Sequence, residues 1–380
     1  MNRRVVVTGL GVVSALGSNV DTFWQALARG QNGIRPIEAI EPGALRFPNG
    51  AEVPDWDPAK HFDEKEAALL DLFAQFGVVA ARQAVVDAAI EWTAARREQT
   101  AIITGSCVGG QGTEDEGFVN LYRKNIPRVN PLTIPRTMEN AAASRISLET
   151  GIVGPTYTIS TACSSANHAI GQAFWMVRSG AVEMAITGGS EAVFSLGFLK
   201  AWEAMRVVSP DTCRPFSKDR RGLILGEGGA MLVLEPLDAA RARGARIIGE
   251  IVGFGMSSDA FHITQPSPDG GARAMAAALA DAGLKPEEEF QCGAVFADGA
   301  DRRFAFQAKV MASLRIEGFA QPGLHRLDAV QRLEFPAEAQ QITPVTVGMH
   351  HRGGASVIAP AERRGKRRQP GLGDATLLRG

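Results

Sequence analysis

A strand-like run in the middle of the chain gives way within a few residues to a helix-like run, and a cysteine stands at the junction. Residues 156–159 are of types that favour β-strands. From Ala166 onward, apolar residues recur near helical spacing until Gly180, which can end a helix. A chain that passes this abruptly from strand to helix is predicted to have a mixed α/β fold.

Cys163, at this junction, is a candidate nucleophile. Ser164 or Ser165 can cap the helix that follows, which places the thiol at the helix N-terminus. Unpaired backbone N–H groups and the positive end of the helix dipole favour a thiolate there. The alternative is a small buried cysteine packed at a strand end, as most free cysteines are.

Composition indicates a folded protein of a reducing compartment. The four cysteines form no CxxC pair, so neither a disulfide framework nor a zinc site is expected, and we predict a cytoplasmic protein. The net charge of −1 gives no reason to expect a nucleic-acid or membrane partner. No apolar segment is long enough to span a bilayer.

Strand-like and helix-like runs alternate along the chain, and one arrangement occurs twice. Gly9 and Gly11 follow a β-like run, and Gly253 and Gly255 follow a similar one. In each half an alanine-rich helix and a β-run ending in glycine come later, which favours a duplicated α/β unit. Ser14 occupies the third glycine position of a dinucleotide motif, so we expect these glycines to let two backbones approach closely instead of binding a nucleotide.

Several motifs, in this order, resemble those of the β-ketoacyl-acyl carrier protein synthases, condensing enzymes with a thiolase-like fold. The resemblance extends from about residue 4 to about residue 284 and implies duplicated βαβαβ halves in α-β-α-β-α layers. We place the halves at residues 1–245 and 246–360, the second divergent or truncated, before a basic and disordered tail at 361–380. The motifs are Val7-Thr8-Gly9-Leu10-Gly11, Thr161-Ala162-Cys163-Ser164-Ser165, Gly188-Gly189-Ser190-Glu191, Arg214-Pro215-Phe216-Ser217, Leu225-Gly226-Glu227-Gly228-Gly229 and Ser257-Ser258-Asp259-Ala260-Phe261-His262.

The resemblance implies a decarboxylative Claisen condensation. Cys163 would accept an acyl group from a phosphopantetheine thioester on an acyl carrier protein, and a malonyl thioester would then lose carbon dioxide and attack the acyl group. The backbone N–H of Cys163 would supply one oxyanion donor. No cofactor or metal is implied, and the expected partners are the acyl carrier protein and either a second copy of the chain or a homologous synthase.

Two further positions match the family near the site. Val108 matches a position that lines the acyl-chain pocket, although a residue packed at a strand end would look the same. His262 matches a histidine that lies near the site but outside the catalytic pair.

The C-terminal part departs from the family pattern. Asp298 stands where the first catalytic histidine is expected, and an ionised carboxylate would repel the enolate that a histidine stabilises. His350 or His351 could be the second histidine, but the lysine expected before it is missing. The basic run at 363–368 could bind an acidic carrier protein, although its glycine and proline neighbours favour a disordered tail.

Three hypotheses fit these residues. The chain is a synthase whose final segment has diverged, a non-condensing partner subunit that resembles a chain-length factor, or an inactive truncated synthase. We favour the first and predict that Cys163 is acylated, whereas condensation is slow or needs a partner chain.

Overall fold

The computed structural model describes residues 3–285 and a short strand at residues 314–315. The chain divides into two units, residues 1–334 and 335–380, and every described residue belongs to the first. Asp298, His350, His351 and the segment 361–380 therefore lie outside the described residues. The boundary expected near residue 245 stays a prediction.

Seven strands form one mixed sheet in the described part of the chain. Their spatial order is β5 (Thr156–Ile159), β4 (Thr100–Gly105), β6 (Met184–Glu191), β7 (Gly228–Pro236), β1 (Val5–Ser14), β8 (Gly249–Ile251) and β9 (Leu314–Arg315). β4 runs parallel to β5 and β6, whereas β7 runs antiparallel to β6 and β1. A separate antiparallel pair consists of β2 (Arg35–Pro36) and β3 (Asn49–Gly50).

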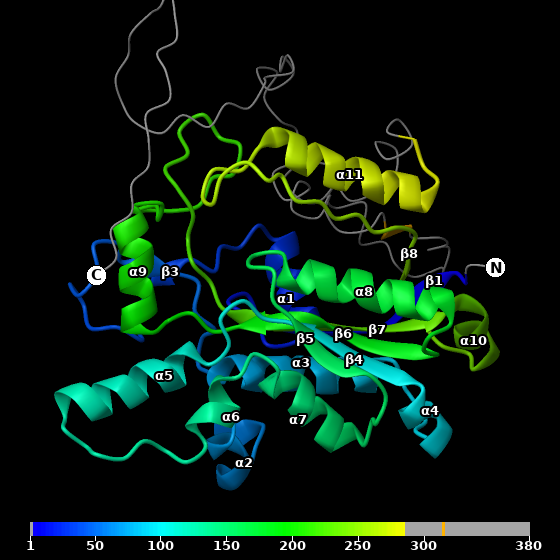
Figure 1. Cartoon of the computed structure of the whole chain (residues 1–380), viewed down its shortest axis with the longest axis horizontal. Coiled ribbons are helices and arrows are strands. Elements are labelled where there is room, and N and C mark those ends of the chain that lie inside the picture. The colour runs from blue at the N-terminus through cyan, green and yellow to red at the C-terminus, as the bar shows by residue number, and fades with distance from the viewer. Residues whose placement is uncertain (1–2, 286–313, 316–380) are drawn as a thin grey trace, which may run out of the picture. The chain divides into compact units, whose positions relative to one another are not determined.

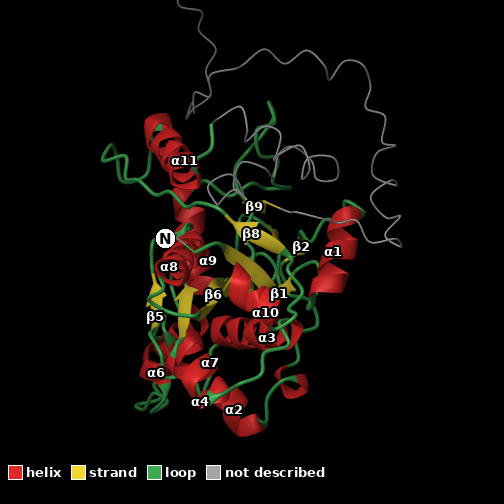
Figure 2. Ribbon diagram, turned by 90° about the vertical axis from the view of Figure 1, so that its right-hand side faces the viewer, coloured by secondary structure: helices red, strands yellow, loops and turns green. Residues whose placement is uncertain are grey.

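Helices cover both faces of the seven-stranded sheet, as Figures 1 and 2 show. α3 (Leu72–Asp87) and α7 (Ala141–Thr150) lie on one face, and α8 (Ser165–Ser179) lies on the other. α11 (Pro268–Ala282) lies on the same side as α8. This arrangement of helices and sheet confirms the predicted mixed α/β fold.

Shorter helices surround this framework. None of the helices in residues 3–285 has both the length and the apolar character that crossing a membrane requires. They are α1 (Val20–Ala28), α2 (Glu64–Ala68), α4 (Ala94–Glu98), α5 (Gln111–Phe118), α6 (Thr133–Thr137), α9 (Leu196–Met205) and α10 (Leu237–Ala242), with a 3-10 turn at Pro58–Lys60 and a π-helical turn at Val119–Arg123.

The glycines of β1 allow α3 to lie directly against the sheet. A Cβ atom at Gly9 would lie closer than 3.0 Å to the carbonyl oxygen of Ala84, and one at Gly11 would lie equally close to that of Ala80. Both contacts are with helix backbone, which cannot move aside as a flexible side chain can. The expected close approach of two backbones is confirmed.

A similar contact between a glycine pair and a helix occurs later in the chain, after β8. A Cβ atom at Gly253 would lie 2.6 Å from the carbonyl oxygen of Ala278 on α11, and one at Gly255 would lie too close to that of Ala274. Glycines two residues apart thus meet alanines four residues apart at both places. For Gly9 and Gly11 of β1, the spacing follows because alternate strand residues and every fourth helix residue share a face.

A buried carboxyl group lies at the start of β7. Oε1 of Glu227 accepts a hydrogen bond from the backbone N–H of Val53 at 3.0 Å, whereas Oε2 has no partner among the described residues. Burial raises the pKa of Glu227 to about 7, and the negative charges of Glu52 and Asp71 act in the same direction. The start of the central strand β7 thus has next to it an acid that titrates near neutral pH.

Candidate active site

Cys163 lies on a tight turn between β5 and α8. β5 ends at Ile159, α8 begins at Ser165, and the Cys163 side chain is exposed. Ala162 has φ of 52°, a left-handed conformation that costs a non-glycine residue about 1–2 kcal/mol. The predicted strand, turn and helix are confirmed, as is the helix end at Gly180, and the buried alternative for Cys163 is wrong.

The two serines after Cys163 fold the turn instead of capping the helix. Ser164 occupies the N-cap position, but its hydroxyl donates to the carbonyl oxygen of Thr161 at 2.8 Å. Ser165 Oγ accepts from the backbone N–H of Thr161 at 2.9 Å and donates to the carbonyl oxygen of Ala162 at 2.7 Å. The prediction of a side-chain cap is therefore wrong, because both hydroxyls point back to the strained turn.

The helix start fits closely against the ends of two strands. A Cβ atom at Gly105, the last residue of β4, would collide with the backbone at Ser165 and Ala166. A Cβ atom at Gly189 of β6 would lie 2.7 Å from Cβ of Ala166. Glycines at both positions therefore fix where α8, and with it Cys163, begins.

Val108 lies in the loop that follows β4, beside the Cys163 turn. Ser160 Oγ donates to the carbonyl oxygen of Cys107 at 3.4 Å, and the electrostatic influence of Cys163 on the Cys107 thiol also places the two cysteines near each other. The structure thus brings Val108 and Cys163 to neighbouring loops.

Glu191, at the end of β6, holds this loop in place. Its carboxylate accepts from the backbone N–H of Cys107 at 2.6 Å and from the Ser106 hydroxyl at 3.1 Å. Burial raises the pKa of Glu191 despite these hydrogen bonds. Burial, reinforced by the negative charge of Glu191, also raises the pKa of the Cys107 thiol, which makes Cys107 a poor nucleophile.

Of the remaining predicted site residues, the structure describes His262. His262 lies in the exposed segment before α11, where its Nδ1 accepts from the backbone N–H of Thr264 at 3.1 Å. No hydrogen bond or ring contact joins His262 to Cys163 or Val108 in residues 3–285. Asp298 and His350 lie outside the described residues, so their roles stay predictions.

Sequence reasoning missed His168, which lies on the first turns of α8. Its Nδ1 is 2.8 Å from Thr161 Oγ1 and 3.1 Å from the carbonyl oxygen of Ser164. The signal was present, because residues four apart on a helix share a face and His168 follows Ser164 by four. The contact to Thr161 depends on the turn geometry and could not be read from spacing.

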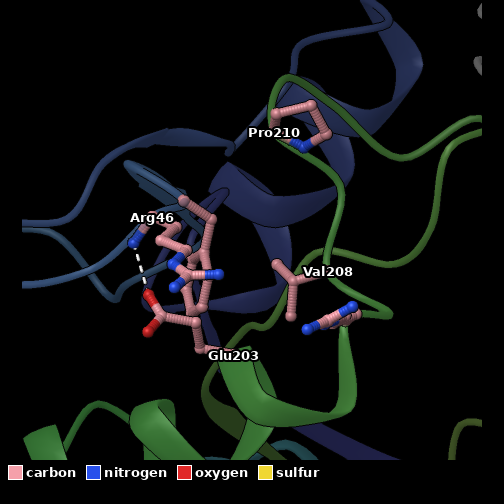
Figure 3. A pocket seen from close by; sticks show the side chains of 6 residues that line it. Arg46, Glu203, Val208 and Pro210 are labelled. Atoms are coloured by element: carbon pink, nitrogen blue, oxygen red, sulfur yellow. Dashed lines mark hydrogen bonds between the residues drawn. The ribbon is translucent and has the colours of Figure 1, made fainter.

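A surface pocket of about 200 Å³ lies beside the end of α9 (Figure 3). A carboxylate oxygen of Glu203 accepts from the backbone N–H of Arg46, and this hydrogen bond lowers the pKa of Glu203. The residues that line this pocket include none of the candidate site residues. Within residues 3–285, no three His, Cys, Asp or Glu side chains are grouped as a metal ion would need.

Curated relatives match most of the chain. The chain is 41% identical over 290 residues to nodulation protein E of Rhizobium sp. (strain N33), covering 76% of this chain and 71% of the relative. It is 38% identical over 294 residues to 3-oxoacyl-[acyl-carrier-protein] synthase 2 of Staphylococcus aureus (strain COL), with the same coverage of both.

Solved structures and a family model agree with these relatives. The ishigamide ketosynthase/chain length factor superposes with a TM-score of 0.72 at 32% identity, covering 82% of this chain and 77% of that one. A type II polyketide ketosynthase in complex with its acyl-carrier protein gives a TM-score of 0.66 at 27% identity, covering 76% and 72%. Residues 2–240 match the family model of the beta-ketoacyl synthase N-terminal domain. The chain therefore belongs to the beta-ketoacyl synthase family.

Proposed function

We propose that this chain is a 3-oxoacyl-acyl carrier protein synthase in which Cys163 accepts the acyl group. The observation that carries the proposal is an exposed thiol on a strained turn fixed between β5 and α8. The Cys163 sulfur attacks the thioester carbonyl, and the phosphopantetheine thiolate leaves. A thiolate suits this step because it is nucleophilic near neutral pH and is also a good leaving group later.

Mass spectrometry of the full chain after incubation with an acyl-acyl carrier protein tests this step. We expect the acyl adduct on Cys163 and none in the Cys163→Ala variant. Cys213, which is also exposed, serves as the internal control for non-specific acylation. The proposal fails if Cys163 carries no adduct.

The second step is proposed to be slow in the chain alone. Malonyl thioester loses carbon dioxide, and its α-carbon attacks the acyl carbonyl as the bond to the Cys163 sulfur breaks. Asp298 stands where the family places a histidine that stabilises the enolate, and an ionised carboxylate there opposes that charge. His350 is the candidate for the remaining histidine.

Carbon dioxide release from malonyl-acyl carrier protein measures this step. Asp298→His is expected to raise the rate, and Asp301→His provides the same substitution at a neighbouring acid. Rapid decarboxylation by the unmodified chain alone would contradict the proposed deficit.

Val108 and His262 are proposed substrate-binding residues of the same reaction. The place of Val108 on the loop next to Cys163 supports an apolar lining for the acyl chain. Val108→Phe is then expected to shorten the longest acyl group that Cys163 accepts. An unchanged acyl-length profile would contradict this assignment.

We further propose that the chain forms a homodimer through the β5 side of the sheet. In the described part of the chain β5 lies at one edge of the sheet, beside β4, and unpaired strand edges are sites of chain association. Residues 118–138, from the last residue of α5 onward, contain a concentration of exposed apolar side chains. They are Phe118, Tyr122, Ile126, Val129, Leu132, Ile134 and Met138.

Sedimentation of paired variants tests the homodimer. Ile134→Glu places a charge in this apolar segment and is expected to weaken association. Ile263→Glu is the matched control, because Ile263 is also exposed but lies in the segment before α11, outside residues 118–138. Equal effects of the two substitutions would contradict an interface at residues 118–138.

A second candidate function is a non-condensing partner subunit of an active synthase. Asp298 at the histidine position favours it, and so does the likeness to the ishigamide ketosynthase/chain length factor. Co-purification of a homologous synthase that keeps both histidines would support this function. Condensation by the purified chain alone would exclude it.

A further inference from the structure

The contacts of His168 extend to both sides of Cys163. His168 Nδ1 lies 2.8 Å from Thr161 Oγ1, two residues before the cysteine, and 3.1 Å from the carbonyl oxygen of Ser164, one residue after it. A carbonyl oxygen can only accept, so a proton on Nδ1 satisfies both partners at once. One ring nitrogen thus ties together the two ends of the turn.

This turn needs support, because it contains a residue in a strained conformation. Ala162, between Thr161 and Cys163, has φ of 52°. Such a conformation persists in a non-glycine residue only where the surrounding contacts enforce it. The Thr161 contact to His168 joins the turn to the body of α8.

The imidazole also contacts an aromatic ring from the segment after β8. The ring of His168 meets that of Phe254 edge to face, with centroids 5.9 Å apart. Phe254 is buried, and its backbone N–H donates to Asp281 at 2.9 Å. The imidazole is therefore fixed between a rigid aromatic ring and the turn.

We propose that His168 is a positioning residue that sets the placement of Cys163 through Thr161 and Ser164, without touching the substrate. This inference rests on the proposed acylation of Cys163. It also predicts how fast the Cys163 thiol reacts with a small alkylating agent. That rate does not depend on any acyl carrier protein.

Two substitutions that replace the imidazole with an amide distinguish a positioning role of His168 from a purely structural one. In His168→Asn, the amide lies at the distance of Nδ1 from the backbone and can replace the contact with Thr161. In His168→Gln, the amide lies one bond further out, near the place of Nε2. Both variants lose the ring contact with Phe254, so their melting temperatures are expected to fall by similar amounts.

The measured quantity is the rate of iodoacetamide adduct formation on Cys163, located by peptide mass spectrometry at neutral pH. His168→Gln is expected to change the rate roughly threefold to tenfold, the range for loss of one hydrogen bond, and His168→Asn to restore it. Thr161→Val should reproduce the effect of His168→Gln, and Thr161→Ser, which keeps the hydroxyl, should not. Combining Thr161→Val with His168→Gln should add nothing further.

Equal alkylation rates of Cys163 in the Asn and Gln variants would overturn the inference. Alkylation rates that vary among the variants only as their melting temperatures do would also overturn it. Acyl transfer is measured in parallel. An unacylated wild-type chain would refute the proposed function, while the alkylation rates would still decide the role of His168.

Discussion

Replacement of Glu227 by glutamine should alter how stability depends on pH. The folded protein raises the pKa of this carboxyl from 4.5 to about 7, chiefly because the group is buried. One of its oxygens also has no hydrogen-bond partner among the described residues. At 1.36 kcal/mol per pKa unit, this difference corresponds to about 3 kcal/mol.

The direction of the pH dependence of stability follows from whether the folded or the unfolded chain keeps the Glu227 proton. Below about pH 4.5, Glu227 is protonated in both the folded and the unfolded chain. Between about pH 4.5 and pH 7 only the folded protein keeps the proton, so the free energy of unfolding decreases as pH rises. Above about pH 7 both states are ionised and this contribution is constant. Glutamine has no proton to lose, so Glu227→Gln should remove the decrease.

Urea unfolding of wild type and Glu227→Gln, measured from about pH 4 to about pH 8, tests this expectation. The variant should gain about 3 kcal/mol relative to wild type across that range. Glu116→Gln, at an exposed position on α5, should follow the wild-type curve throughout. A difference between Glu227→Gln and wild type that stays constant with pH would refute the reasoning.

Three other predictions concern the glycine contact of β1 and the loop after β4. Gly11→Ala should lower the free energy of unfolding by about 3 kcal/mol, because the added Cβ would meet the backbone of α3. Gly271→Ala, in open space on α11, should not lower it, and urea unfolding compares the two variants. Glu191→Ala should cost about 1–3 kcal/mol in the same assay, because it leaves Cys107 N–H without its acceptor. Cys107 should react with iodoacetamide more slowly than exposed Cys213, as peptide mass spectrometry can measure.

Local sequence was sufficient to predict the elements around the site. Residues 156–159 form β5 and Gly180 ends α8, because strand-forming side chains and a glycine with positive φ are local preferences. The glycine pair in β1 was also informative, since only glycine permits the observed approach to α3.

Contacts that depend on distant pairing could not be predicted in this way. Gly9 and Gly11 were placed after the first β-like run, but β1 continues through them to Ser14, because β7 pairs with it along that length. The hydrogen bonds of Glu191 to the loop after β4 depend on β4 and β6 lying side by side, although they are far apart in sequence. His168 was missed for a similar reason, since Thr161 reaches it only through the turn.

The paired glycine contacts bear on how this protein could be engineered. Ala80 and Ala84 of α3 and Ala274 and Ala278 of α11 belong to alanine-rich stretches that a designer would treat as freely variable. All four alanine side chains are buried, and their carbonyl oxygens lie against the glycines, so a larger side chain at these positions would push the helix away from its contact. A variant library should hold these four alanines and their glycine partners fixed. Substitutions are better placed at solvent-exposed helix positions such as Val86 of α3, which is 78% exposed.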